Sequence, residues 1–443
     1  MASLQMPSEE GVDDDFTRSP VPAGARMPRF GLTMAWWSVC SAMFWIVVSA
    51  TLALNYGSVN TLIGLGLSAI SYSIINGIIT RHAIRTGLSV SLFSQTLFGR
   101  SGAPLATLIF FATAIYYAVF EGSVIAVAIQ SYFPVLSLHQ AYLLVVAYSV
   151  PLVFGSVQRW LDKLNGVLLP FYLLGLVAAV GLTLHDFGYS PAWLAVVPAG
   201  GAPVSGWWSC FCYFMGVWIL MMYTWDYARF GREEDSQYHA RLTFGLPFYV
   251  FTFVINGAIG IFLANSIPGN GSLSEVSVVL ALLKLMGFVG LAFVWVSQTR
   301  INTANFYLAT INMQGFFERA LGVRLPKIAW GVVVGAVVYL LMLTNVFSFI
   351  LQALAYQGIF VVAWVGVALA HILFLPDDNA WGDDVPMVRR EGVTAWFVAA
   401  GLGIALMQAG PFMAQWSAPC SALVSFGFYG LLQRQRMASN ATA

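Results

Sequence analysis

Ionisable side chains inside long apolar stretches are the residues of this sequence best suited to chemistry. Glu121, Lys284 and Arg300 lie within such stretches, and Asp226 and His371 lie near the ends of two others. A charge at membrane depth is costly, so such residues usually line a pathway or a binding site. No HExxH, GxSxG, paired histidines or carboxylate dyad lies at that depth, so an enzyme is not expected. No cysteine and histidine spacing indicates a metal site.

Glu121 follows Tyr117 by four residues, so both side chains lie on one face of the same helix. A carboxylate accepts hydrogen bonds, which suits a substrate that carries N–H donors or a positive charge. A buried carboxyl group can also carry a proton. The structural alternative is an ion pair with Arg300 or Lys284, and Lys284 could equally extend to the membrane interface.

Asn302 and Asn305 lie one helical turn apart in a polar part of an otherwise apolar stretch. An amide offers both a donor and an acceptor, which suits a substrate edge that carries both kinds of group. The alternative is hydrogen bonding between neighbouring helices, a common use of amides in membranes.

The composition places the chain in a membrane. Of 443 residues, 59% are hydrophobic and 9% are charged, too few charges to cover the surface of a soluble protein of this length. The 20 Lys and Arg nearly balance the 19 Asp and Glu, whereas a nucleic-acid-binding protein would need a basic excess. These figures exclude a soluble globular enzyme, a disordered chain and a nucleic-acid binder, and they make the lipid bilayer the expected partner.

Apolar stretches long enough to cross the bilayer as helices determine the expected fold class, because a spanning helix needs about 20 residues. We count twelve, which predicts an all-α integral membrane protein of about 12 transmembrane helices. They cover residues 32–55, 59–80, 104–130, 140–157, 164–184, 206–225, 243–265, 277–312, 329–345, 348–373, 394–411 and 414–432.

The basic residues predict how the chain is oriented. All Lys and Arg residues except Lys284 and Arg300 fall in the tails and in alternate loops, which the positive-inside rule assigns to the cytoplasm. We therefore expect a multi-pass protein of the plasma or inner membrane with both termini cytoplasmic. The predicted parts are a cytosolic tail at 1–30, a transporter core at 31–375, a cytosolic loop at 376–393, two additional helices within 394–432 and a cytosolic tail at 433–443.

Helix-weakening residues occupy corresponding positions in the first and sixth stretches. Small residues fill 38–42 in the middle of the first, and Ser209, Cys210, Cys212 and Gly216 interrupt the sixth. Many secondary transporters contain two inverted five-helix repeats whose first helices are interrupted at a midplane binding site. The pattern favours such repeats at about 31–185 and 206–375, although close helix packing also uses small residues.

Several motifs resemble the nucleobase:cation symporter-1 family, which contains cytosine, hydantoin, allantoin and uracil permeases. The sixth stretch ends in DYARFGR at 226–232, similar to the family signature D-[FY]-x-R-[FY]. Further similar segments are TGLS at 86–89 with FGRSGA at 98–103, VVPA at 196–199, and NTANFY at 302–307. The resemblance covers roughly residues 30–375. It implies a LeuT-type fold of five plus five inverted helices with two C-terminal helices, and alternating access.

The same resemblance implies a set of site residues. Tyr117 and Glu121 match the family's ring-stacking aromatic and its polar neighbour, Asn302 and Asn305 match its eighth-span amides, and Val217 or Trp218 matches a second ring face. Asp226 and Arg229 would tether the cytoplasmic end of span six as a gate or a structural pair.

The resemblance also implies a cation site beside span one. Sodium-coupled members use carbonyls of that span, here around Cys40 and Phe44, together with a hydroxyl pair in span eight. Arg300 stands at this place, with Ser297 and Thr299 nearby. Either the guanidinium excludes sodium electrostatically, or Ser297 and Thr299 still hold it.

The sequence thus predicts a secondary active transporter that imports a nucleobase or related small heterocycle, with a cytosine-like substrate favoured. The coupling ion would be H⁺ or Na⁺, with protons slightly preferred, and no other cofactor is expected. The alternatives are a LeuT-type transporter of an amino acid, betaine or vitamin, or an uncoupled facilitator. The sequence leaves the oligomeric state open and is compatible with a monomer.

Overall fold

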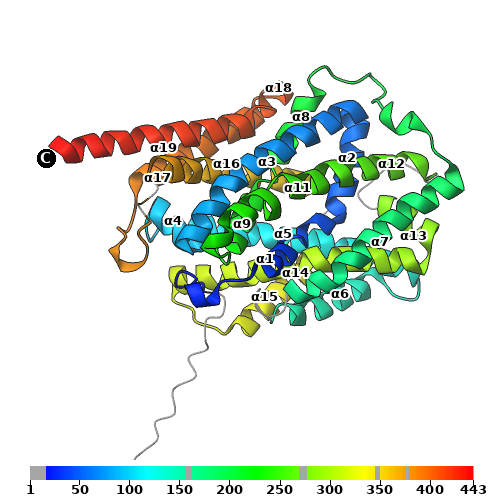
Figure 1. Ribbon diagram of the computed structural model, residues 1–443, viewed down its shortest axis with the longest axis horizontal. Coiled ribbons are helices and arrows are strands. Elements are labelled where there is room, and N and C mark those ends of the chain that lie inside the picture. The colour runs from blue at the N-terminus through cyan, green and yellow to red at the C-terminus, as the bar shows by residue number, and fades with distance from the viewer. Residues whose placement is uncertain are drawn as a thin grey trace, which may run out of the picture.

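The computed structural model describes residues 16–154, 162–268, 277–344, 350–375, 377 and 379–442. Within these ranges the chain forms helices and short connections without β-strands, apart from one isolated bridge between Met27 and Gly231 (Figure 1). The α-helices are α1 (Arg29–Trp36), α2 (Met43–Tyr56), α3 (Ser58–Thr86), α4 (Val90–Phe98), α5 (Ala103–Tyr132), α6 (Leu138–Leu152), α7 (Asp162–Phe187), α8 (Gly206–Met215), α9 (Ile219–Ala228), α10 (Ser236–Tyr238), α11 (Leu246–Tyr249), α12 (Asn256–Ser266), α13 (Ser277–Met286), α14 (Phe288–Leu321), α15 (Lys327–Met342), α16 (Ile350–Phe374), α17 (Arg390–Gln408), α18 (Pro411–Ala414) and α19 (Ser417–Thr442). Two π-helical turns, His239–Thr243 and Val250–Ile255, lie beside α11.

In the described residues, each of the twelve predicted spans contains one helix or several consecutive helical segments; the seventh, for example, contains α11, the π-helical turn Val250–Ile255 and α12. In the described part of the chain, seven helices are long and apolar enough to cross a membrane, and the bent pair of α8 and α9 makes an eighth. The helices α6 and α15 are apolar but shorter. The all-α membrane fold predicted from composition is therefore confirmed.

Both predicted interruptions are present. In span one, α1 ends at Trp36 and α2 begins at Met43, with a 3-10 turn at Val39–Ser41 between them. In span six, α8 and α9 are inclined by 45° to each other across a short break. We refer to residues 37–42 as the span-one break and to residues 216–218 as the span-six break.

The eighth predicted span, 277–312, needs correction because it is two helices. Gly287 has φ +57°, a left-handed conformation that glycine adopts at little cost, and it separates α13 from α14. The helix α14 then continues to Leu321, beyond the predicted end of the span.

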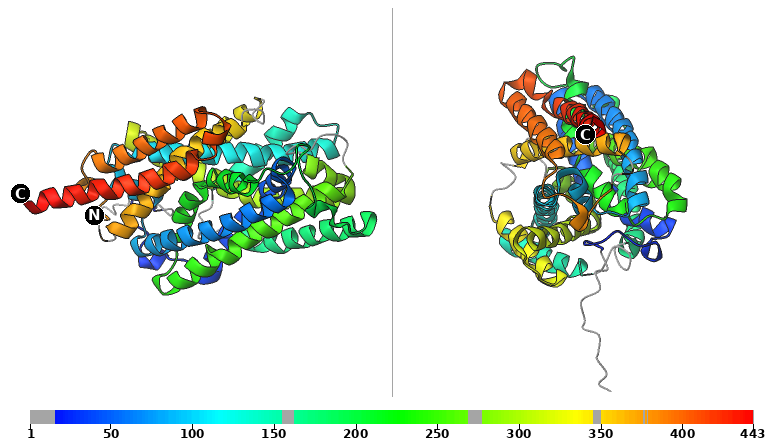
Figure 2. Two further views of the ribbon diagram at one scale, coloured as in Figure 1. Left: turned by 90° about the horizontal axis from the view of Figure 1, so that it is seen from above. Right: turned by 90° about the vertical axis from the view of Figure 1, so that its left-hand side faces the viewer.

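The long helices run roughly along the long axis of the molecule in Figure 1, and α14 packs along α5 in its interior. Helices α16, α17 and α19 pack against one another and extend the bundle on one side, as the two views of Figure 2 also show. The helices differ in burial. In the most apolar 18 residues of Arg29–Tyr56, 83% of the residues are buried, against 22% in the most apolar 18 residues of Lys163–Phe187. The exposed Val167, Leu174 and Val177 of α7 therefore form a surface suited to lipid.

Three segments predicted as polar tails or a loop have local structure in their described residues. Residues 1–15 of the predicted tail lie outside the described residues, but residues 16–29 are bound to the bundle, with Val21 and Met27 buried. The predicted loop at 376–393 is bonded to α4 through its main chain; for example, the N–H of Arg389 donates to the carbonyl of Phe98 (3.1 Å). The predicted tail at 433–443 continues α19 to Thr442.

Candidate functional site

A narrow central cavity lies where the two breaks meet α5 and α14. Its free volume is about 20 Å³, room for little more than one water molecule. Its walls are mostly apolar and aromatic with two polar side chains, as in many small-molecule sites. The lining residues are Val39, Ala42, Phe44, Trp45, Tyr117, Glu121, Val217, Ile219, Leu220, Tyr223, Ile301 and Asn305.

The carboxylate of Glu121 is held by a side chain that sequence reasoning missed. Glu121 is 1% exposed, and Nε2 of Gln298 on α14 donates to its Oε2. The Oε1 of the same amide accepts a hydrogen bond from the backbone N–H of Met43, 2.8 Å away at the start of α2. Gln298 therefore joins Glu121 to the span-one break. The alternative pairing of Glu121 with Arg300 is not observed among the described ion pairs.

The face of α14 toward the cavity differs from the expected one. Gln298, Ile301 and Asn305 are spaced by three and four residues, so they form one stripe along the helix. Oδ1 of Asn305 accepts a hydrogen bond of 3.0 Å from the Tyr223 hydroxyl. Asn302 is turned away from this stripe and packs near Gly122 of α5, outside the cavity lining. No described residue hydrogen-bonds its buried amide.

Aromatic rings form the cavity wall opposite α14. Phe44 meets Tyr117 edge to face with ring centroids 6.0 Å apart, and it meets Trp45 at 5.1 Å. The span-six break contributes Val217 to the lining, whereas its neighbour Trp218 is buried nearby and does not line the cavity. Of the two residues that the resemblance allowed, the structure places Val217 at the cavity.

Arg300 binds the span-one break. Its side chain is fully buried, and Nη2 donates to the carbonyl of Trp37 (3.1 Å). The guanidinium also lies over the ring of Tyr172 on α7, 5.7 Å from the centroid, and interacts with the Cys40 thiol. No described carboxylate lies within ion-pair distance of it, and its Nε and Nη1 have no hydrogen-bond partner among the described residues.

Ser297 and Thr299 do not share a site, so their predicted pairing at a cation needs correction. Oγ of Ser297 donates to the carbonyl of Ser41, whereas Oγ1 of Thr299 bonds the Tyr148 hydroxyl of α6 at 3.0 Å. Residues two apart on a helix point to nearly opposite sides, which explains the separation. Ser297 and Arg300, three apart, face the same break.

Lys284 belongs to α13, on the other side of Gly287 from the polar part of α14, and its side chain is exposed. It therefore cannot be the buried partner of Glu121. The apolar run through 277–312 concealed the turn that separates the two segments.

Asp226 and Arg229 lie at the predicted gate position. Oδ1 of Asp226 accepts from the backbone N–H of Val90 at the start of α4 (2.8 Å), and Arg229 Nε lies 3.8 Å from that oxygen. Nη1 of Arg229 donates to the carbonyl of Phe16 (2.8 Å). This carboxylate thus caps a neighbouring helix N-terminus, a stabilising arrangement.

Residues 16–29, which we call the N-terminal strap, join several helix ends at this end of the bundle. Nη1 of Arg26 donates to the carbonyls of Ile84 and Gly231, both at 2.6 Å. Arg18 forms an ion pair of 2.7 Å with Glu318 near the end of α14. The strap therefore connects the ends of α3, α9 and α14.

Besides Gln298, the sequence analysis missed Asn256 and Tyr172. Nδ2 of Asn256 donates to the carbonyl of Cys40 (2.7 Å), and the Tyr172 hydroxyl donates to Oδ1 of Asn256 (2.9 Å). An amide inside the seventh apolar stretch was the available signal, since buried amides in membranes usually bind a neighbouring element. The described residues contain no group of three or more His, Cys, Asp or Glu that could hold a metal ion.

Comparison with known proteins places this arrangement in a fold class. No protein-family model matches the chain, and no curated protein matches it. Among solved structures, it resembles Mhp1, a nucleobase-cation-symport-1 family transporter, in a closed conformation with bromovinylhydantoin bound: the TM-score is 0.73 at 15% identity over 95% of this chain and 96% of that chain. The inward-facing conformation of Mhp1 gives 0.72 at 13% identity, covering 94% and 93%. A Na⁺-coupled sialic acid symporter in a substrate-bound outward-open state gives 0.61 at 12% identity, covering 94% and 91%.

The chain is therefore a multi-pass membrane protein with the LeuT-type fold of secondary transporters. The fold that the sequence motifs implied is confirmed. Secondary transporters built on such repeats place their binding site at discontinuous helices, and this chain has two of them.

Proposed function

We propose that this protein imports a nucleobase or a related small, flat heterocycle by alternating access, with a cytosine-like ring favoured. The observation that carries the proposal is the Glu121 carboxylate, buried in an aromatic cavity between two broken helices. Ring walls from Tyr117 and Phe44 suit a planar substrate. The carboxylate and the Asn305 amide suit an edge that carries both N–H donors and a carbonyl acceptor.

The cavity's small volume supports a substrate that enters only when the helices rearrange. At about 20 Å³ it cannot contain a heterocycle without movement of its walls. The amide of Gln298 links Glu121 to the first residue of α2, so a substrate that binds the carboxylate also acts on the span-one break. Such a link between substrate and a broken helix supports alternating access.

For coupling, we propose protons rather than sodium. Every carbonyl of residues 37–41 accepts a hydrogen bond from a protein side chain, and Arg300 adds a permanent positive charge. At about 4 Å and an effective dielectric near 20, repulsion between that charge and Na⁺ would be about 4 kcal/mol. Glu121 would then carry the proton. One charge moving down about 100 mV supplies about 2.3 kcal/mol, enough for substantial accumulation.

Uptake by proteoliposomes tests the proposal. We expect labelled cytosine to accumulate under an inward proton gradient, and uracil, hydantoin or glycine betaine to accumulate less. Glu121→Gln should weaken equilibrium binding of cytosine on the order of ten- to a hundredfold, and binding of uracil far less, because a bond to a charged acceptor is lost. Proton-driven accumulation should be lost for every base, because glutamine cannot carry the proton. Glu391→Gln, at the start of α17, is the matched control. Equal loss of binding for every base would assign Glu121 to structure instead of substrate recognition.

Replacing sodium by choline at fixed pH and voltage tests the coupling ion. Uptake should be unchanged by the replacement and should fall when a protonophore is added. A cytosine affinity that rises with sodium concentration would overturn proton coupling, and Ser297 would then be the candidate ligand.

A further inference from the structure

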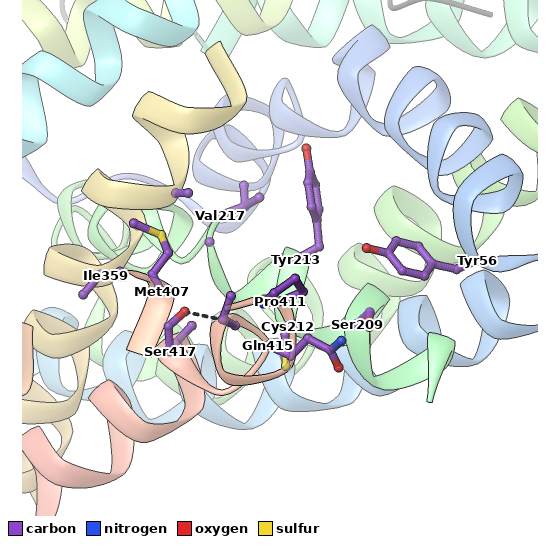
Figure 3. A pocket seen from close by; sticks show the side chains of 15 residues that line it. Tyr56, Ser209, Cys212, Tyr213, Val217, Ile359, Met407, Pro411, Gln415 and Ser417 are labelled. Atoms are coloured by element: carbon purple, nitrogen blue, oxygen red, sulfur yellow. Dashed lines mark hydrogen bonds between the residues drawn. The ribbon is translucent and has the colours of Figure 1, made fainter. Parts of the chain in front are cut away.

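A second, larger cavity lies beside the central one, on the α8 side of the span-six break. Its volume is about 400 Å³, within the range of small-molecule sites, against about 20 Å³ for the central cavity. Its walls come from α8, α16 and the C-terminal elements α17 to α19 (Figure 3). We call it the side cavity.

The side cavity adjoins the central cavity at the span-six break. Val217 lines both cavities, and Gly216 lines the side cavity only. Tyr213, in the last turn of α8, lines the side cavity just before the break. In Figure 3 the ring of Tyr56 points toward Tyr213, and the ring of Tyr213 points away from Gln415 and Ser417.

The lining of the side cavity suits a small flat molecule. Small residues form part of the lining, among them Gly216 and Gly358. These two lie so close together that a Cβ on Gly358 of α16 would be 3.0 Å from Gly216 backbone atoms. The two tyrosine rings offer faces for stacking. The side-chain amide of Gln415 lines the same wall and forms no hydrogen bond within the described part of the chain, so it can pair with a mixed donor and acceptor edge.

We propose that the side cavity is a staging site, in which the transported heterocycle is held before it passes Tyr213 into the central cavity. The helices α17 to α19 thereby form one wall of the transport path. This inference rests on the proposed function, because it takes the same class of substrate. Its binding is independent of Glu121, which lines only the central cavity.

The C-terminal wall allows the cavity to be filled without touching the central site. Ala414 on α18 lines the side cavity, and Ala409, between α17 and α18, does not. Ala414→Phe should therefore lower the kcat/KM of cytosine uptake by about tenfold, while equilibrium binding at the central site changes by less than about twofold. Ala409→Phe should leave both unchanged. Unchanged uptake in Ala414→Phe would overturn the staging site.

A thiol reports occupancy directly. Cys212 lines the side cavity and is partly exposed, as is Cys420, whereas Cys40 and Cys210 are buried. In a Cys420→Ser background, we expect cytosine to protect Cys212 from alkylation. At ten times the dissociation constant for the side cavity, the rate of alkylation should fall about tenfold. The protection should persist in Glu121→Gln. Loss of protection in Glu121→Gln, or protection by phospholipid instead of cytosine, would overturn the inference. Failure of the wild type to transport any of the heterocycles would instead refute the proposed function.

Discussion

The two helix breaks of this protein satisfy their backbone groups in different ways. In the span-one break, side chains from two other helices bind the carbonyls: Arg300 and Ser297 from α14, and Asn256 from α12, whose amide is oriented by the Tyr172 hydroxyl of α7. In the span-six break, the N–H groups of residues 216–218 donate to carbonyls three residues earlier, within the same segment. The first break is tied to its surroundings, and the second is satisfied locally.

The difference indicates separate roles for the two breaks. Buried carbonyls must be paired, so the span-one break depends on the side chains that bind it and cannot change alone. The span-six break faces cavities on both sides through Val217 and can change shape without losing long-range hydrogen bonds. We infer that the span-one break senses charge and that the span-six break admits the substrate.

The largest effect should come from Arg300. Arg300→Met removes a charged hydrogen bond and a cation–π contact, together about 3 kcal/mol, which corresponds to a loss of uptake on the order of a hundredfold. Arg300→Lys should retain part of the activity, because it keeps the charge but loses the planar fork. The measurement is proteoliposome uptake, with the exposed Arg324→Met as control. If Arg300→Met took up substrate as fast as the wild type, the span-one break would not depend on the side chains that bind it. The proposed difference between the two breaks would then be wrong.

Asn256 should have the next largest effect. Asn256→Leu leaves the Cys40 carbonyl without its 2.7 Å donor, at a cost of about 1–3 kcal/mol, and should lower uptake about tenfold. Thermal unfolding in detergent measures the loss of stability alongside uptake. Asn265→Leu is the matched control, because that exposed amide bonds only the carbonyl of Ile261 in its own helix among the described contacts. Equal effects of both changes would argue against a special role for the span-one break.

A smaller effect should follow from crowding the span-six break. Gly358→Ala places a Cβ 3.0 Å from Gly216 and should destabilise the protein by about 1–2 kcal/mol. Gly401→Ala, where a Cβ meets no atom within 4 Å, should be neutral or stabilising, because alanine favours helices. Paired melting curves isolate the steric cost. A Gly358→Ala variant as stable as Gly401→Ala would show that this contact relaxes freely.

The smallest effect should be that of Thr299→Val. It removes one hydrogen bond to Tyr148, worth about 0.5–1.5 kcal/mol, and touches neither break. Uptake should change little and its ion dependence not at all, whereas Ser297→Ala, which loses the contact with Ser41, should reduce uptake more. If Thr299→Val changed the ion dependence of uptake, the Thr299 hydroxyl would again be a candidate ligand of the cation.

The sequence by itself determined the helices, the two interruptions and the face of α5 that carries Tyr117 and Glu121. Each follows from local rules: a span length, small residues in the middle of a span, and a spacing of four residues. Along α14, however, the polar run 297–305 contained more candidates than the sequence could orient. Each residue turns a helix by about 100°, so only packing against α5, α6 and the span-one break decided that Gln298 and Asn305 face inward while Asn302 and Thr299 do not. The acceptors of Arg300 and Asn256 likewise lie far along the chain, where tertiary structure alone brings donor and carbonyl together.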